Sequence, residues 1–446
     1  NAESVVQDID ENNSPSLPKP TLKELTSASF RVGCLGFGGP AGQIALMHRI
    51  FVDEKKWVDE DRYAHALNYC MLLPGPEAQQ LATYVGWLLH GVRGGIIAGT
   101  LFIVPGALVV FLLSWIYMAA GHLPLVSAAF FGVKAAVFAL VAEAMIRIGK
   151  RALKGHHAVL IAILSFVALF FWSAPFPLVI LVAGLIGVVL NKFGPSPVTQ
   201  EVADAAQSPS LAKTLATAAI WGTAWFAPVI GAFVALGPDH PLARVGRLFS
   251  TLAVVTFGGA YATLAYLKQQ AVEVEGWLTT NQMLDGLGLA ETTPGPLVLV
   301  NEYVGFVAGW SSGGFWLASL CALMAAWCTF APSFVWIFAG APLAERLRRL
   351  PAANAALKAV TAAVLGVIAN LALWFAMHLM FRTIQTLELP GKGELPLPDP
   401  QTLDWKAALL CVSACVAVFR FQTGVLTLII GSAVCGVALT LIFACT

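Results

Sequence analysis

The sequence predicts an all-α polytopic membrane protein made of two inverted-topology repeats, each with broken or re-entrant helices near the midplane of the bilayer. Two observations lead to this prediction. The chain of 446 residues is 58% hydrophobic and only 11% charged, whereas soluble domains are about one quarter charged. In addition, one pattern of glycine, proline and tryptophan occurs twice at a fixed distance, as expected for an internal duplication.

Long uncharged stretches indicate membrane-spanning helices. Residues 155–191 and 303–344 contain no Asp, Glu, Lys or Arg, and residues 94–146 contain only Lys134 and Glu143. Each stretch exceeds the roughly 20 residues that cross a bilayer. Because lipid offers backbone groups no partners, such segments fold as helices, and the alternating strands of a barrel are absent from the sequence. The net charge of +1 gives no support for nucleic-acid binding.

The repeated pattern has three landmarks that all shift by 220 positions without a gap. The first copy is Phe37-Gly38-Gly39-Pro40, then Trp57, then Pro74-Gly75-Pro76, and the second is Phe257-Gly258-Gly259-Ala260, then Trp277, then Pro294-Gly295-Pro296. Further along, Val133-Lys134-Ala135 parallels Leu357-Lys358-Ala359. A single Pro-Gly-Pro is a weak signal, but three landmarks at one offset predict two repeats.

The landmarks divide the chain into five parts. We expect a disordered tail at 1–20, a first repeat at 21–193, a linker at 194–210, a connecting transmembrane helix at 211–238, and a second, inverted repeat at 245–446. No signal-peptide pattern precedes the first repeat, so the first membrane segment is expected to direct insertion.

Four predicted helices of the first repeat, at 21–35, 40–51, 61–73 and 76–90, are too short to span the membrane alone. At helical rise, a piece of about 14 residues is about 21 Å long. These pieces are therefore half-helices of two broken spans or two re-entrant hairpins, and the sequence leaves both open. Longer spans are predicted at 95–120, 124–147, 157–172, 175–192, 212–236, 315–340, 353–380, 405–420 and 424–444.

Basic residues predict the orientation of the spans. Arg147, Lys150, Arg151 and Lys154 follow the span 124–147 and should be cytoplasmic by the positive-inside rule. Counting back places the N-terminus in the cytoplasm as well. The extra span at 212–236 then turns the second repeat over, and the loop 382–404, which lacks a positive excess, is expected outside.

The duplicated breaks predict a binding site. Gly and Pro breaks free backbone groups, which is tolerated where they face protein or a wet cavity, and paired interrupted segments mark the substrate site of repeat-built transporters. Helix N-termini at such breaks favour anions. The alternative is that the glycines only allow close helix packing. Two kinds of break, each duplicated, favour the site.

The motifs resemble the two domains of the chromate transporter (CHR) family, long-chain type. The resemblance is carried by the two Phe-Gly-Gly and Pro-Gly-Pro copies, Leu73 and Gln79-Gln80-Leu81-Ala82, and it extends over about 21–192 and 245–444. It implies a secondary transporter in the bacterial inner membrane that exports chromate, driven by the proton-motive force or the membrane potential, and so confers resistance. Sulfate or another oxyanion is the alternative substrate, because a fold does not fix its substrate. A homodimer is left open.

Candidate residues for binding a tetrahedral dianion are those that supply donors or positive charge. We expect the site to include Gly38, Gly39, Gly258, Gly259, Thr292, Thr293, Gln79, Gln80, Lys134, Lys358 and Arg31. For the polar residues, a hydrogen bond between helices is the alternative role, and Lys358 near a helix start has the alternative of reaching the interface.

Proton coupling requires an acid that changes charge inside the membrane. Glu77, Glu291 and Glu302 lie beside or just past a break and are the candidates, while His48 beside a charged loop is expected to be structural. The eight cysteines form no metal-binding pattern, and no Walker or hydrolase motif is present in the sequence. We expect no cofactor, no metal and no enzyme activity. An anion channel and an intramembrane enzyme are the competing interpretations.

Overall fold

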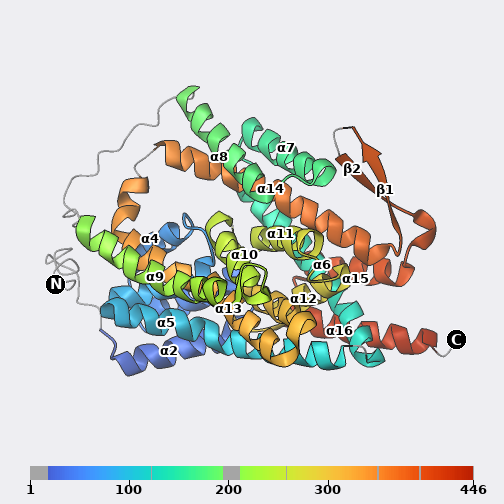
Figure 1. Cartoon of the computed structure of the whole chain (residues 1–446), viewed down its shortest axis with the longest axis horizontal. Coiled ribbons are helices and arrows are strands. Elements are labelled where there is room, and N and C mark those ends of the chain that lie inside the picture. The colour runs from blue at the N-terminus through green and yellow to red at the C-terminus, as the bar shows by residue number, and fades with distance from the viewer. Residues whose placement is uncertain are drawn as a thin grey trace.

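The computed structural model describes residues 19–121, 123–193, 211–257, 259–348, 351–390 and 393–444. Residues 1–18 of the predicted tail, the predicted linker 194–210 and the candidate Gly258 lie outside this part of the chain. The described part is helical apart from its loops and one two-stranded hairpin (Figure 1). The prediction of an all-α polytopic membrane protein is thereby confirmed.

The first half contains α2 (Leu22–Leu35), α3 (Gly39–His48) with a π-helical turn at Arg49–Glu54, α4 (Glu60–Cys70), α5 (Glu77–Ala120), α6 (Pro124–Ala152), α7 (His156–Trp172) and α8 (Phe176–Phe193). After α9 (Leu211–Leu236), the second half contains α10 (Pro241–Val255), α11 (Ala260–Lys268) with a π-helical turn at Gln269–Val274, α12 (Thr280–Thr292), a 3₁₀ turn at Leu297–Leu299, α13 (Val300–Arg348), α14 (Pro351–Met380), α15 (Trp405–Phe421) and α16 (Val425–Ala444). The order of elements is the same in both halves.

α5 and α13 each consist of two helices joined by a sharp turn. In α5 the turn is at His90 (φ −140, ψ 26) and Gly91 (φ 59, ψ −151), and a Cβ on Gly99 would overlap Oγ1 of Thr83. In a straight helix, sixteen residues would separate these positions by about 24 Å. The first part of α5 therefore folds back against the second, as the separate helices predicted at 76–90 and 95–120 require.

The turn in α13 has nearly the same backbone conformation, at Gly313 (φ −162, ψ 22) and Gly314 (φ 65, ψ −158). Across it, Nδ2 of Asn301 donates to Oγ1 of Thr329 at 3.0 Å. Because the positive φ at Gly91 and Gly314 is accessible mainly to glycine, the duplicated turn is a local consequence of the sequence.

Equivalent helices of the two halves run antiparallel. In the α6–α14 pair, Phe138 stacks on Phe375, whereas Gly149, three turns later, faces Leu365, ten residues earlier. In the α5–α13 pair, Gly95 faces Phe338 and Gly99 faces Phe334. Inverted repeats require this arrangement; the insertion of the two halves in opposite orientations in a bilayer stays a prediction.

The helices form two bundles, and each contains helices of both halves (Figure 1). In the first bundle α2, α5, α9, α10 and α13 pack together, and in the second α6, α7, α8, α14, α15 and α16 do so. The short helices α3, α4, α11 and α12 lie at and between the bundles. Since those helices flank the repeated motifs, the fold brings the breaks of both halves toward its interior.

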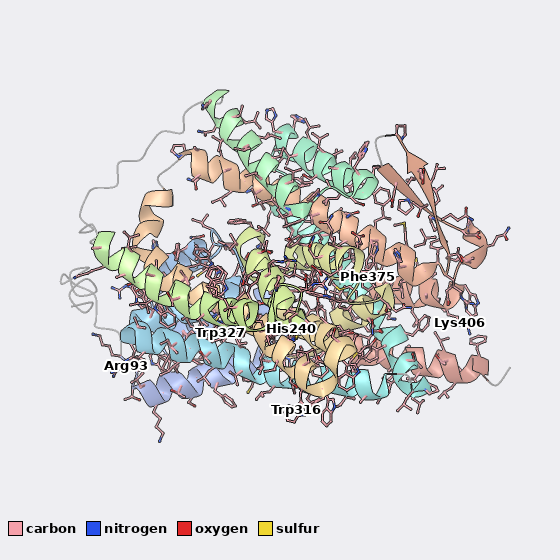
Figure 2. The ribbon with its side chains drawn as sticks, viewed as in Figure 1. Arg93, His240, Trp316, Trp327, Phe375 and Lys406 are labelled. Atoms are coloured by element: carbon pink, nitrogen blue, oxygen red, sulfur yellow. The ribbon has the colours of Figure 1, made fainter. Side chains whose placement is uncertain are left out.

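The outer surface is apolar. Six helices of the described chain are long and apolar enough to cross a membrane. Large apolar side chains on them point outward, and Trp316, which is 79% exposed, projects from the rim of the molecule (Figure 2). In water such a surface would be a liability, whereas in lipid it is the expected exterior.

A hairpin of β1 (Ile384–Leu389) and β2 (Gly393–Pro398) follows α14 and was not predicted. The strands pair antiparallel, with Thr386 opposite Pro396 and Glu388 opposite Glu394. The expectation for 382–404 rested on its charge alone, and the alternation in Ile384-Gln385-Thr386-Leu387 was overlooked as a strand signal.

Candidate functional site

Each Pro-Gly-Pro loop is hydrogen-bonded to the residue that precedes Phe-Gly-Gly in the other half. The N–H of Gly75 donates to the carbonyl of Thr256 at 3.0 Å, and the N–H of Gly295 donates to the carbonyl of Gly36 at 3.0 Å. Both members of the second pair are 220 residues from their counterparts, so the two bonds are related by the internal duplication. We call Pro74–Glu77 with Thr256–Ala260 the first crossing, and Pro294–Leu297 with Gly36–Pro40 the second crossing.

Left-handed glycines turn the chain at both crossings. The φ angles are +86° at Gly38, +67° at Gly39, +105° at Gly75, +89° at Gly259 and +94° at Gly295. A side chain at these positions would be strained. A Cβ on Gly38 or Gly39 would have no neighbour within 4 Å, and one on Gly259 would lie 3.4 Å from Oε1 of Glu77.

Helix N-termini gather at the crossings. α3 begins at Gly39 with Gly38 as its N-cap, α11 begins at Ala260 with Gly259 as its N-cap, and α5 begins at Glu77. In none of the three does a side chain of the N-cap residue accept a hydrogen bond from the helix. Uncapped N–H groups and the helix dipole favour an anion, so the crossings have the chemistry of an oxyanion site.

Gln43 ties the second crossing together and was missed in the sequence. Its Nε2 donates to the carbonyls of Gly36, at 3.1 Å, and of Gly295, at 2.5 Å, and its side chain is fully buried. The available signal was an amide side chain in a short apolar helix directly after a break. Its counterpart 220 residues later is Thr263, so the two crossings are held differently.

The predicted polar candidates lie beside the crossings and are partly engaged by their own helices. Thr292 and Thr293 donate to the carbonyls of Leu289 and Ala290 in the last turn of α12. Nε2 of Gln80 donates to the carbonyl of Pro74 at 2.7 Å, and Nε2 of Gln79 contacts Oγ1 of Thr83 at 3.4 Å. The Oε1 atoms of Gln79 and Gln80 are buried without a partner in the described chain. A role of these four in substrate binding stays a prediction.

Comparison with known proteins identifies the family. The family model described as "Chromate transporter" matches residues 23–188 and 243–437. The chain belongs to the chromate transporter family. It is 34% identical over 302 residues to the chromate transport protein of Pseudomonas aeruginosa, covering 66% of this chain and 68% of the relative. It is 28% identical over 371 residues to that of Cupriavidus metallidurans, covering 79% and 82%. No solved structure matches the chain significantly.

This membership confirms the resemblance and supports a role in chromate transport across a membrane. A third relative, 24% identical over 358 residues and covering 80% of this chain and 85% of its own length, is an uncharacterized transporter of Methanocaldococcus jannaschii. The two stretches matched by the chromate transporter model include both crossings. Both crossings therefore belong to the part of the chain that the family shares.

The acidic candidates differ in how close they are to the crossings. Oε1 of Glu77 lies near Gly259 in the first crossing. Glu291, just before the second crossing, accepts a hydrogen bond from the hydroxyl of Tyr261 at 3.1 Å, and Tyr261 directly follows the first crossing. This bond therefore connects the two crossings. Glu302 is only 2% exposed, and its Oε2 has no partner in the described chain.

The three basic candidates are in different environments. Lys134 is largely buried, and its Nζ lies 2.9 Å from Oδ1 of Asp285. Lys358 lines a cavity of about 380 Å³ together with Leu72 of the first Pro-Gly-Pro segment and Phe257. Arg31 is half exposed and pairs with Glu54 at 3.0 Å, and within the described chain no hydrogen bond or ion pair joins it to a crossing.

Asp285, Tyr117 and Tyr261 are further polar residues that the sequence analysis did not single out. The hydroxyl of Tyr117 donates to Oδ2 of Asp285 at 2.8 Å. A charged residue inside an apolar helix is a usable signal, and the sequence prediction applied it to Lys134 but not to Asp285.

The π-helical turns place a basic and an acidic side chain together in each half. His48 lies 3.3 Å from Asp53 and 2.7 Å from Glu60, and 220 residues later Lys268 pairs with Glu273. His48 lies outside the six helices that are long and apolar enough to cross a membrane, and the hydrogen bond to Glu60 raises the pKa of His48 above its usual value. The expectation that His48 is structural is consistent with these contacts, although it remains untested.

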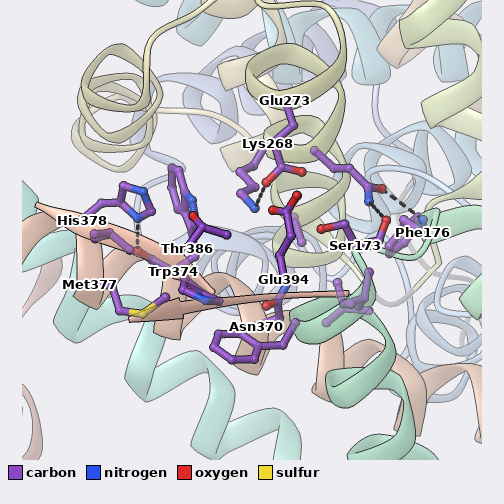
Figure 3. Close-up of a pocket in the computed structure, with 17 residues that line it drawn as sticks. Ser173, Phe176, Lys268, Glu273, Asn370, Trp374, Met377, His378, Thr386 and Glu394 are labelled. Carbon is purple, nitrogen blue, oxygen red and sulfur yellow. Dashed lines mark hydrogen bonds and ion pairs between the residues drawn. The ribbon is translucent and has the colours of Figure 1, made fainter. Parts of the chain in front are cut away.

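Lys268 belongs to a second cavity of about 260 Å³ beneath the β-hairpin (Figure 3). Its Nζ lies 5.0 Å from the ring centroid of Trp374, and Glu273 and Glu394 also line the cavity. With two carboxylates and one ammonium, this cavity has an unfavourable potential for a dianion. The crossings and the Lys358 cavity are the better candidates.

Proposed function

We propose that the protein is a secondary transporter that exports chromate across the bacterial inner membrane by alternating access coupled to the proton-motive force, and thereby gives chromate resistance. The observation that carries this proposal is the pair of symmetry-related hydrogen bonds Gly75–Thr256 and Gly295–Gly36 in a member of the chromate transporter family. Each half thus supplies one side of both crossings, so a movement of one half against the other changes both together.

In this proposal the oxyanion is held by main-chain N–H groups at the helix N-termini of the crossings. Gly38, Gly39 and Gly259 leave room for close approach, and Lys358 supplies fixed positive charge from the adjoining cavity. Chromate is a dianion, so oriented dipoles and one ammonium offset a large part of its desolvation. The basic residues that follow α6 place the N-terminus in the cytoplasm in this proposal.

Glu77 is the coupling acid that the geometry favours. Its carboxyl lies beside Gly259, where it faces any anion held in the first crossing. Ionised Glu77 repels a dianion and protonated Glu77 does not, so proton and substrate binding are linked at this position. A proton and a dianion that leave together carry a net negative charge, so the inside-negative membrane potential, the electrical part of the proton-motive force, drives their export. The equivalent residue of the second crossing is Leu297, and this half has no such link.

The test is chromate uptake into everted membrane vesicles with and without a proton gradient, with sulfate as a competitor. We expect uptake that responds to the gradient in the wild type, and uptake that ignores it in Glu77→Gln. Glu388→Gln on the exposed hairpin is the matched control and should behave as wild type. Equal competition by sulfate would favour a general oxyanion transporter. Flux that follows only the voltage in the wild type would favour a channel and refute the coupling.

A further inference from the structure

Two equivalent contacts between the first and second halves are closed to different extents. At one of them, which we call the closed side, α12 of the second half packs against α6 of the first half, so that a Cβ on Gly288 would lie 2.7 Å from Val133. The equivalent helices α4 and α14 are not packed to a comparable extent in the described chain. Instead, the cavity of about 380 Å³ lies between Met71 and Leu72, at the end of α4, and α14. α4 is on the left in Figure 1, while α12 and α6 are right of centre.

Helix packing shows which positions of α6 and α14 correspond. A Cβ on Gly436 meets Ala128 and Gly132 of α6, and one on Gly187 meets Ala355 and Ala359 of α14. The α6 and α14 residues of these matching contacts are 227 apart. By this register the counterparts of Val133 and Lys134 are Val360 and Thr361, which both line the cavity. The sequence analysis aligned Lys134 with Lys358, whereas the helix packing aligns Lys134 with Thr361. Lys358 lies about one helical turn before the true counterpart of Lys134.

The closed side contains its own counter-ion. Lys134 and Asp285 have side chains only 13% and 10% exposed, and no other ion pair of the described chain has both partners so buried. Oδ1 of Asp285 faces Lys134, and Oδ2 accepts the hydroxyl of Tyr117. The positive charge of Lys134 is thus balanced by the carboxylate of Asp285.

The open side, where the cavity separates α4 from α14, has no such counter-ion. The residue of α4 that corresponds to Asp285 is His65. Lys358 is exposed in the cavity and has no carboxylate partner within the described residues. If α4 packed against α14 as α12 packs against α6, it would bury a lysine without a negative partner, which is strongly unfavourable.

We propose that Asp285 is an internal substitute for the oxyanion. It allows the closed side, between α6 and α12, to close without substrate, whereas the open side, between α4 and α14, closes only after a dianion has entered the cavity and balanced the charge of Lys358. The inference rests on the proposed function, because it takes the oxyanion as the ligand of Lys358. It adds a positioning role for Asp285. It also adds a difference between the two sides, because the open side closes only when the oxyanion is bound.

The test is equilibrium binding of chromate to the purified full-length protein in lipid nanodiscs. Asp285→Asn frees Lys134, so the apparent affinity for chromate should rise roughly tenfold, the factor expected when a charge-assisted hydrogen bond no longer competes. His65→Asp places a carboxylate where α4 lacks one, so the affinity should fall by about the same factor. A merely structural role of Asp285 cannot produce a gain.

The double variant K134M/D285L is the control for folding and for the origin of the gain. It removes both buried charges together, which proteins tolerate better than removal of one, and it should lack the gain because no ammonium is released. Unchanged or weaker binding in Asp285→Asn, or a gain that persists in the double variant, overturns the inference. If Asp285→Asn does not fold, unchanged affinity in His65→Asp overturns it instead. Lys358→Ala tests the proposed site separately: wild-type chromate binding there refutes Lys358 as a ligand, whatever the Asp285 variants show.

Discussion

Replacing Gln43 by leucine should destabilise the second crossing. Nε2 of Gln43 donates to the carbonyls of Gly36 and Gly295. In Gln43→Leu, Gly36 keeps the N–H of Gly295 as a partner, but the buried carbonyl of Gly295 loses the donor that the structure gives it. Leaving one buried acceptor unsatisfied costs about 1–3 kcal/mol. We therefore expect the variant to fold with a free energy of unfolding lower by roughly this amount.

The matched control is Thr263→Val. Thr263 occupies the position equivalent to Gln43 in the other half and is also buried, but no hydrogen bond of its hydroxyl is found within the described residues. The Thr263→Val substitution removes a polar group at the equivalent position but leaves no buried carbonyl without its donor. We expect a change within about 0.5 kcal/mol, as for a substitution that breaks no named interaction.

The assay is reversible unfolding in mixed micelles with increasing denaturing detergent, together with the melting temperature. The predicted loss corresponds to a decrease of a few °C. Because Gln43 holds the Pro-Gly-Pro loop in place, chromate flux at equal protein level should fall as well. Equal stabilities of Gln43→Leu and Thr263→Val would refute the reasoning, since then the bridge contributes nothing.

Two further predictions concern other parts of the fold. The hydrogen bond to Glu60 raises the pKa of His48, so the stabilisation that this pair contributes is full below the ordinary histidine pKa of about 6.5 and is lost as the pH rises through the raised pKa of the folded protein. The melting temperatures of the wild type and His48→Gln should therefore converge in alkali. A difference between them that does not change with pH contradicts this. A Cβ on Gly132 would overlap the carbonyl of Ser432 in α16, so Gly132→Ala should lower the free energy of unfolding by roughly 1–3 kcal/mol or more. The control Gly222→Ala should be neutral, because a Cβ there meets nothing within 4 Å. Equal protein yield and melting temperature of the two variants would show that α6 and α16 are not packed so closely.

The helices and their breaks were predictable because each depends on local sequence. Uncharged apolar runs leave the backbone only the helix in lipid, and Gly39 and Gly75, with their counterparts Gly259 and Gly295, adopt a positive φ that few other residues tolerate. The separation of 76–90 from 95–120 was also predicted, and it corresponds to the sharp turn at His90 and Gly91 within α5. These features were accessible without any knowledge of tertiary contacts.

The partners of the site residues were not predictable in this way. Nothing in the sequence near Lys134 indicates Asp285, because the two are 151 positions apart and belong to different halves. Gln43 was missed for the same reason, since its acceptor in Gly295 belongs to the opposite repeat. A duplication predicts that two breaks are alike, but the pairing of each with the other half is a property of the assembled fold.

The two halves share a backbone but differ in the side chains that determine charge. The left-handed glycines and the sharp turns recur with nearly the same angles in both halves. At corresponding positions, however, Glu77 has Leu297 as its counterpart, and His48 has Lys268. These differences in charge leave the shared backbone geometry in place and give the two sides of the protein different electrostatic potentials for protons and anions.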